Sequence, residues 1–195
     1  MWFDATSYLL DKDPKGEKEY HTYLKNGLLI DTLPLTLLIL GAYDTKHHTN
    51  FLNRQYNYTL SDYSCLRKFL NGLSAQRTTI SITPHILTEF LNHLQQSVKN
   101  PKDFTSIIQE SDLLTAIQEE QIAKETILKE KLLLNKALEI GEISLILVSQ
   151  TRTKKMAILS QDEMALIKSD QDFGLLAIHY TDIRNAFNSF PIDAF

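Results

Sequence analysis

A short apolar run near the start of the chain carries a single carboxylate, and this combination restricts the fold more than any other feature of the sequence. Residues 28–40 read LLIDTLPLTLLIL, and Asp31 is the only charged residue among them. An isolated carboxylate buried in an apolar core costs several kcal/mol unless a partner neutralises it. The run must therefore fold so that Asp31 either leaves the core or meets a compensating group.

The same run divides into a strand and a helix that meet at the carboxylate. Residues 28–31 are typical of a strand that is buried on both faces. Pro34 stands where a helix begins, with Thr32 or Leu33 as the predicted N-cap, and Gly41 is predicted to end this helix. The run is about 13 residues long, whereas a membrane-spanning helix needs roughly 20, so we expect no membrane partner.

A second segment follows the same plan. Residues 78–98 read TTISITPHILTEFLNHLQQSV, with a β-branched strand, Thr83 as the predicted N-cap and Pro84 at the first helical position. Residues 156–162 (MAILSQD) and residues 175–180 (LLAIHY) are typical of two further strands. Strands that alternate with helices indicate a parallel sheet joined by right-handed crossovers. We therefore expect an α/β fold with a central, mainly parallel sheet.

Helical patterns account for much of the remaining sequence. Ser61 is predicted to cap a helix that ends at Gly72, after a polar connection over residues 43–57. Another helix is expected to begin near Glu142. A helix is predicted over residues 4–10, and a helix or helix pair, with Ser111 as the cap, is predicted over residues 111–136.

Length and composition indicate one domain. With 195 residues, 43% hydrophobic and 23% charged, the chain has the composition of a soluble globular protein with one core. We expect a single domain over residues 1–195, with an N-terminal extension (1–26) and a helical insertion (98–138). The formal net charge of −4 gives no general sign of a nucleic-acid or anionic-membrane binder. Cys65 is the only cysteine, and the N-terminus lacks the pattern of a secretory signal, so a cytoplasmic location is expected.

Four acidic residues are placed where a parallel sheet gathers its ligands. Asp31 and Asp162 end two predicted strands, whereas Glu89 lies in the helix after a third strand and Glu142 opens a helix. Ligands bind outside the carboxyl ends of parallel strands, so we expect these four carboxylates to converge. Their mutual repulsion would raise their pKa values unless a divalent cation lies among them. Oxygen ligands without thiolates suit Mg²⁺ or Mn²⁺, which serve phosphoryl chemistry.

Three motifs in this part of the chain resemble those of PIN-domain ribonucleases. Residues 30–41 (IDTLPLTLLILG) resemble the first motif of that family, residues 82–94 (ITPHILTEFLNHL) the second, and residues 157–166 (AILSQDEMAL) the last. The resemblance implies a three-layer α/β/α fold and metal-dependent hydrolysis of RNA phosphodiester bonds by an activated water. The positions that match the family's acidic residues are Asp31, Glu89 and Asp162.

The chain departs from this family in its third motif. The family usually has an aspartate at the start of the helix before the last catalytic strand, whereas this chain has Glu142 in GEISLILVSQ, with Glu139 one turn earlier as a rival. A glutamate keeps the negative charge but is one methylene longer, which changes the geometry of any metal site. The residues that we expect to contact the substrate are Thr32, Asn92, Ser160, Arg152 and Lys154.

Each candidate also has a purely structural interpretation. Asp31 and Asp162 could each cap the helix that follows, and Glu89 could lie on an exposed helix face. The basic segment at residues 150–155 (QTRTKK) is more typical of a solvated loop than of a phosphate contact. A shared helix face, which would suit zinc or iron only with further ligands, is predicted for His85, Glu89 and His93.

Two functions from different classes fit these observations. The first is a metal-dependent endoribonuclease that acts on RNA, either as a defence nuclease or as the toxin of a pair with a cognate antitoxin. The second is a PIN-like fold that has lost catalysis and serves as a binding or scaffold module, which the unusual third motif favours. The additional sequence at residues 43–58 and 98–138 could form a lid, a homodimer surface or a partner site.

Overall fold

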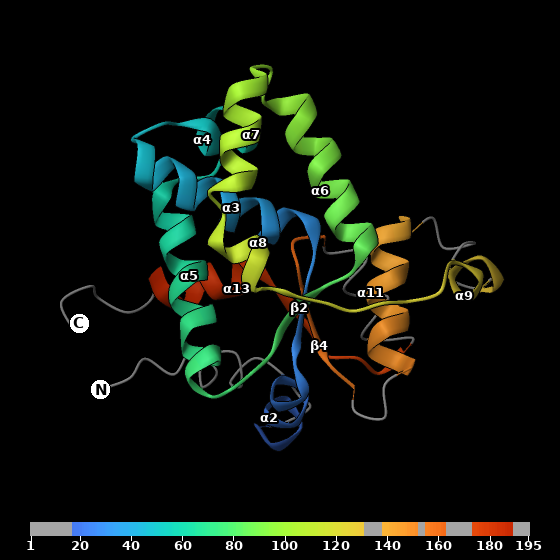
Figure 1. The fold of residues 1–195 in the computed structure, drawn as a ribbon. Coiled ribbons are helices and arrows are strands. Elements are labelled where there is room, and N and C mark those ends of the chain that lie inside the picture. Colours follow the sequence, from blue (N-terminus) through green and yellow to red (C-terminus); the bar gives the residue numbers. More distant parts are fainter. Residues whose placement is uncertain (1–16, 131–137, 152–154, 163–172, 189–195) are drawn as a thin grey trace.

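A five-stranded parallel sheet forms the middle layer of the structure, a computed structural model that describes residues 17–130, 138–151, 155–162 and 173–188 (Figure 1). The strand order is β3-β2-β1-β4-β5, and each neighbouring pair runs parallel. The predicted α/β class is therefore confirmed. The strands are β1 (Leu28–Ile30), β2 (Ile80–Ile82), β3 (Gln118–Glu119), β4 (Ala157–Ser160) and β5 (Ala177–His179).

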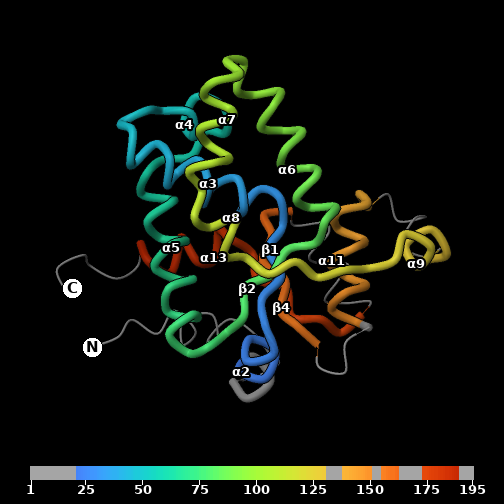
Figure 2. Tube along the Cα trace, viewed as in Figure 1, coloured from blue at the N-terminus to red at the C-terminus, as the bar shows by residue number. Residues whose placement is uncertain are grey.

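Helices flank this sheet and complete a three-layer α/β/α arrangement. In Figure 1, α5 and α13 lie on one side of the strands and α11 lies on the other, and Figure 2 shows the same path as a tube. No helix in the described part of the chain is both long and apolar enough to cross a membrane. The described helices are α2 (Glu17–Asn26), α3 (Thr32–His47), α4 (Phe51–Tyr56), α5 (Leu60–Ala75), α6 (Pro84–Ser97), α7 (Pro101–Gln109), α8 (Asp112–Ala116), α9 (Lys124–Lys129), α11 (Ile140–Thr151) and α13 (Tyr180–Asn188).

Strand β1 lies at the centre of the sheet because its residues are apolar on both faces. Leu28, Leu29 and Ile30 are completely buried. In the register of the sheet, Leu28 lies opposite Ile80 of β2 on one side and Ala157 of β4 on the other. The residue that follows β1 therefore emerges at the carboxyl edge of the sheet, between the ends of the two neighbouring strands.

That residue, Asp31, caps α3, so the predicted cap at Thr32 or Leu33 is wrong. The Asp31 carboxylate accepts a hydrogen bond from the Thr32 backbone N–H, and aspartate is among the most favourable N-cap residues. The helix also continues well past Gly41. A Cβ at Gly41 would lie 2.4 Å from Cγ of Tyr63, so this glycine lets α3 and α5 pack closely instead of ending α3.

Helix α5 begins and ends at residues other than the predicted ones. Thr59, not Ser61, is the N-cap: its hydroxyl accepts a bond from the Asp62 N–H, and the Asp62 carboxylate accepts one from the Thr59 N–H. The expected end at Gly72 is also wrong, because the helix continues to Ala75. Gly72 faces open space, so nothing there requires the chain to turn.

The insertion consists of short elements and not of one long helix. Ser111 caps α8 as predicted, but α8 ends at Ala116. The chain then forms β3, which pairs with the edge of β2 through Gln118 and Glu119. Of the two alternatives predicted for residues 111–136, the described residues contain a pair of short helices, α8 and α9, separated by β3, and not a single helix. Residues 131–136 of that prediction, and the helix predicted over residues 4–10, lie outside the part of the chain that the structure describes.

Candidate functional site

The carboxyl ends of β1 and β4 meet at Asp31. One carboxylate oxygen of Asp31 accepts the N-cap hydrogen bond from the Thr32 N–H, at 2.7 Å, and the other accepts a bond from the Ser160 hydroxyl at the end of β4. The Ser160 oxygen in turn accepts a bond from the Asp162 N–H, at 2.9 Å. Ser160 therefore connects the Asp31 carboxylate to the backbone of Asp162.

These two hydrogen bonds do not compensate Asp31 completely. The side chain is 8% exposed, and this burial raises the pKa of Asp31 above its ordinary value. The negative charges of Asp162 and Glu139 raise this pKa further. The bonds from Thr32 and Ser160 lower it, but the net direction is upward. Asp31 thus caps a helix and still retains uncompensated charge at the carboxyl edge of the sheet.

Glu89, on α6, faces the same region. Burial raises the pKa of Glu89 to about 7, and the nearby charges of Glu139 and Asp31 contribute to this shift. The Thr32 hydroxyl is near enough to lower the pKa of Glu89. Among the described residues, however, the buried Thr32 Oγ1 has no hydrogen-bond partner with acceptable geometry. A hydroxyl that is buried and unpaired beside two carboxylates can bind a ligand without losing an existing bond.

Glu142 lies in the first turn of α11, as the sequence predicts. Its Oε2 accepts a hydrogen bond from the Glu139 N–H at 2.8 Å, so Glu142 helps to cap its own helix. Burial raises the pKa of Glu142 to about 7, with smaller effects from the charges of Asp162 and Asp31. Glu139 is exposed, yet its charge acts on Asp31, Glu89 and Glu142. The structure therefore places both glutamates of the third motif beside the cluster.

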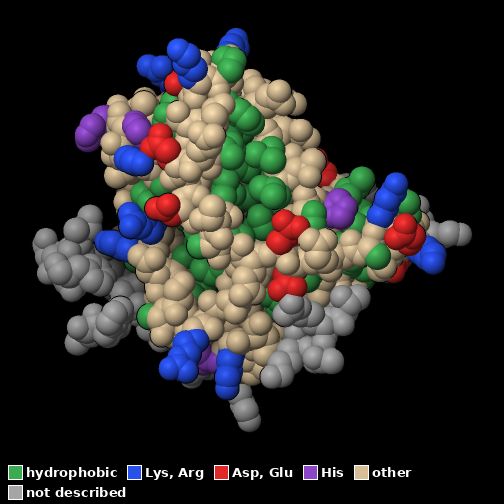
Figure 3. Space-filling view, in the orientation of Figure 1, with side chains coloured by type: hydrophobic (Ala, Val, Ile, Leu, Met, Phe, Trp, Pro, Cys, Tyr) green, Lys and Arg blue, Asp and Glu red, His purple; other side chains and the backbone are tan. Residues whose placement is uncertain are grey.

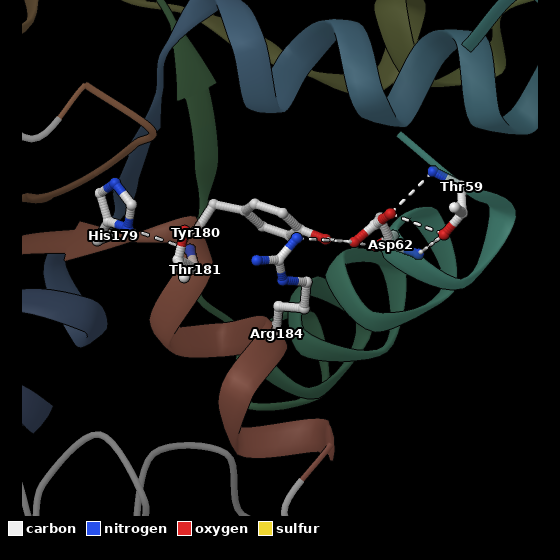
Figure 4. A network of polar contacts seen from close by, with 6 residues as sticks. All are labelled: Thr59, Asp62, His179, Tyr180, Thr181 and Arg184. Atoms are coloured by element: carbon white, nitrogen blue, oxygen red, sulfur yellow. Dashed lines mark hydrogen bonds and ion pairs between the residues drawn. The ribbon is translucent and has the colours of Figure 1, made fainter. Parts of the chain in front are cut away.

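Asp162 is exposed just beyond β4, and a histidine that the sequence interpretation missed holds its loop. The Nδ1 atom of His179, at the end of β5, accepts a bond from the Thr181 N–H at 3.2 Å. Its Nε2 atom therefore carries the proton and donates it to the Gln161 carbonyl at 2.9 Å. Figure 4 shows the His179–Thr181 bond at the end of this strand. A histidine that directly follows the predicted apolar strand LLAI is the sequence signal that could have identified it.

The carboxylates shift one another's pKa values but do not form a closed set of metal ligands. Among the described residues, no three His, Cys, Asp or Glu side chains are close enough to hold one ion. Within the described residues, this finding excludes the zinc or iron site that was considered for His85, Glu89 and His93 on α6. Mg²⁺ usually keeps several waters and binds through one or two carboxylates. The all-oxygen donor set and its uncompensated charge therefore fit a hydrated Mg²⁺ or Mn²⁺ ion better than a closed cage.

Asn92 is the one other predicted substrate contact that lies within the described residues, and it does not join this site. Asn92 is exposed on α6, and no contact joins it to the carboxylates in the described part of the chain. Arg152 and Lys154 lie outside the described residues. Their neighbour Lys155 lies before the amino end of β4, with its Nζ 3.3 Å from the Gly174 carbonyl oxygen. Strand geometry separates Lys155 from the carboxyl end of β4 by about 16 Å, so this part of the basic segment lies away from the carboxylates.

Taken together, the structure defines an α/β/α protein with a cluster of five carboxylates at the carboxyl edge of a parallel sheet. Comparison of the chain with known protein families, with curated proteins and with solved structures finds no match.

Proposed function

We propose that the chain is a metal-dependent endoribonuclease that hydrolyses RNA phosphodiester bonds at this carboxylate cluster. The observation that carries the proposal is the raised pKa of Asp31, Glu89 and Glu142, three acidic residues from distant segments, in which the charge of Asp31 acts on both glutamates. Perturbed carboxylates at the carboxyl edge of a parallel sheet are typical of functional sites. Asp162 extends the cluster across β4.

Each residue has a distinct part in the proposed reaction. A bound Mg²⁺ or Mn²⁺ ion would activate a water and stabilise the leaving oxygen of the phosphodiester. Asp31 and Asp162, which lie at the end of β1 and just beyond β4, would hold the ion, and the negative charge of Glu89 beside them would add to its affinity. Glu89 and Glu142 have pKa values near neutrality, so either one can exchange a proton with water at the site. The unpaired Thr32 hydroxyl would donate to a phosphate oxygen.

The proposal has consequences outside the site. It places the protein in the cytoplasm, where RNA is the substrate, and it predicts a cognate antitoxin if the nuclease acts as a toxin. Arg152 and Lys154 remain proposed RNA contacts, and Asn92 remains one if α6 lies against the bound strand. A lid, a homodimer surface or a partner site remains the proposed role of residues 43–58 and 98–138.

A second candidate function is a PIN-like binding module without catalysis, and two observations favour it. The described acidic residues do not form a closed metal-ligand set, and one oxygen of Glu142 is used to cap α11. Figure 3 also shows hydrophobic side chains gathered on the face between α6 and α7. The partly buried apolar residues of these two helices include Leu87, Leu91, Phe104 and Ile108.

Cleavage of single-stranded RNA separates the two functions. We expect the purified protein to cleave generic single-stranded RNA in Mg²⁺ or Mn²⁺ and to lose this activity in EDTA. Glu89→Gln should reduce the rate by about 10²-fold or more, because it removes a group that exchanges a proton. Gly72→Ala is the matched control and should cleave like the wild type, since Gly72 faces open space on α5. Activity that persists in EDTA would exclude the metal mechanism, and no cleavage with either ion would favour the binding module.

A further inference from the structure

Helix α11 begins unusually close to the Glu89 carboxylate, and a glycine makes this approach possible. A Cβ built on Gly141 would lie 2.5 Å from Oε2 of Glu89 and 2.9 Å from Cδ1 of Ile86. Gly141 does not have a positive φ, so its backbone conformation is one that alanine also adopts. A side chain at this position would therefore displace the Glu89 carboxylate and Ile86 Cδ1, which occupy the space that it would fill.

Two hydroxyl groups, those of Thr83 and Ser144, hold α6 and α11 at this spacing. Ser144 Oγ donates to the Gly141 carbonyl at 2.6 Å, so the Thr83 hydroxyl must donate the 2.6 Å bond that joins the two side chains. Thr83 Oγ1 also accepts from the Ile86 N–H at 3.3 Å, which caps α6. Thr83 and Ser144 are both completely buried. The starts of α6 and α11 are therefore joined by buried hydrogen bonds. Figures 1 and 2 show these two helices as neighbours.

This arrangement also affects the charge of Glu89. The first turn of a helix carries partial positive charge on its unpaired N–H groups, and a carboxylate placed over it is stabilised. Glu142 already accepts the Glu139 N–H, so both glutamates lie at the start of α11. If the Glu89 side chain were displaced, it would move away from both the first turn of α11 and Asp31.

We propose that Gly141 is a positioning residue for Glu89: its missing side chain seats the Glu89 carboxylate between the start of α11 and the Asp31 end of the sheet. The role of this placement in cation binding and RNA cleavage rests on the proposed function. The placement itself does not, because it follows from contacts within the fold.

Unfolding measurements test the placement without reference to activity. Gly141→Ala should lower the melting temperature by about 2–8 °C, since the new methyl group displaces a side chain in a packed region. The matched control is Gly72→Ala, also inside a helix but facing open space, which should raise the melting temperature by about 1–4 °C. In a Glu89→Ala background, most of the loss caused by Gly141→Ala should disappear. An equal loss in both backgrounds would overturn the proposal.

Cation binding and cleavage test the consequence. Gly141→Ala should weaken Mn²⁺ binding, measured by calorimetry well below the melting temperature, by about tenfold, which corresponds to about 1.4 kcal/mol. In a Glu89→Asp background the carboxylate is one methylene shorter, so adding Gly141→Ala should have little further effect on binding or cleavage. A merely structural role for Gly141 would lower stability and leave Mn²⁺ affinity unchanged, and this result would overturn the proposal.

The outcomes also separate this inference from the proposed function. If the wild type neither binds Mn²⁺ nor cleaves RNA, the nuclease proposal fails, and the melting temperatures of the Gly141 and Glu89 variants still decide whether Gly141 positions Glu89. If the wild type binds Mn²⁺ and cleaves RNA while Gly141→Ala matches it in both, only the inference about Gly141 fails.

Discussion

At the scale of single residues, three buried aspartates show how a helix cap differs from a candidate functional group. Asp44 accepts bonds from the Thr49 hydroxyl and from two backbone N–H groups at the start of α4. For Asp62, burial acts to raise the pKa, but bonds from Thr59 and Tyr180 and the charge of Arg184 outweigh it, so the pKa is lowered (Figure 4).

Asp31 has the opposite balance: burial raises its pKa most, the charges of Asp162 and Glu139 raise it further, and the bonds from Ser160 and Thr32 do not outweigh them. A role in helix capping alone accounts for the contacts of Asp44 and Asp62. It does not account for acidic neighbours around Asp31, because a structural cap gains nothing from like charges nearby. The direction of the pKa shift therefore distinguishes Asp31 from Asp62.

The raised pKa values of Glu89 and Glu142 predict how stability changes with pH. Both are raised from 4.5 to about 7, so between these pH values the folded state binds more protons than the unfolded state. The free energy of unfolding contributed by this pair should therefore fall as the pH rises from about 4.5 to 7 and stay low above that range. Both side chains are only partly buried, so solvent screening limits the size of the effect.

Melting temperatures measured in EDTA from pH 5 to pH 8 test this expectation. The double variant Glu89→Gln/Glu142→Gln should lose less stability across this range than the wild type, because neither amide titrates. Comparing the two proteins cancels the contribution of the other titrating groups. Parallel pH profiles for the wild type and the double variant would show that these glutamates have ordinary pKa values.

At the scale of elements, the start of α5 gives a sharp test of helix capping. Thr59→Ala removes the hydroxyl that accepts the Asp62 N–H, and the loss of an N-cap costs about 1 kcal/mol, or about 2–4 °C in melting temperature. Ser61→Ala is the control two residues later, at an exposed position that the sequence alone also allows as the cap. It should leave the melting temperature within about 1 °C of the wild type. A larger loss for Ser61→Ala than for Thr59→Ala would contradict the observed helix start.

The sequence predicts these elements well where local and tertiary preferences agree. Thr83 and Pro84 start α6 as expected, because both the cap and the fixed φ of proline favour a helix there. The predictions that helices end at Gly41 and at Gly72 are wrong, because a glycine inside a helix is tolerated when packing needs it or when nothing opposes it. Gln118 and Glu119 form β3 because the backbone edge of β2 is available to pair with them, although their side chains do not favour a strand.

The carboxylate cluster was predictable only in part. Asp31 and Asp162 could be placed because strand ends in a parallel sheet share one edge. The bond from Ser160 to Asp31 joins residues 129 positions apart, so no local pattern reveals it. The Glu142 bond to the Glu139 N–H depends on where α11 begins, which spacing alone does not fix. The contribution of His179 depends on the conformation of the loop at Gln161.

At the scale of the whole molecule, the sheet gathers charge that its own hydrogen bonds do not compensate. Asp31 follows the central β1 at the carboxyl edge, and Ser160 and Asp162 lie beside it at the end of β4. Helices α6 and α11 carry Glu89 and Glu142 to the same region. Structural purposes alone do not require this concentration of negative charge, which raises pKa values and opposes folding at neutral pH. A cation that binds only the folded state would offset that cost.

The central claim is that Asp31 belongs to a cation site and is more than the cap of α3, and the melting temperature of Asp31→Asn tests it most directly. Asparagine is nearly as good an N-cap and removes one repelling charge, so in EDTA at pH 7 the variant should melt at or above the wild-type temperature. Millimolar Mn²⁺ should stabilise the wild type, by about 2.7 kcal/mol at a hundredfold excess over Kd, and should have almost no effect on Asp31→Asn. If Mn²⁺ leaves the melting temperature of the wild type unchanged, Asp31 is a helix cap only and the cation site does not exist.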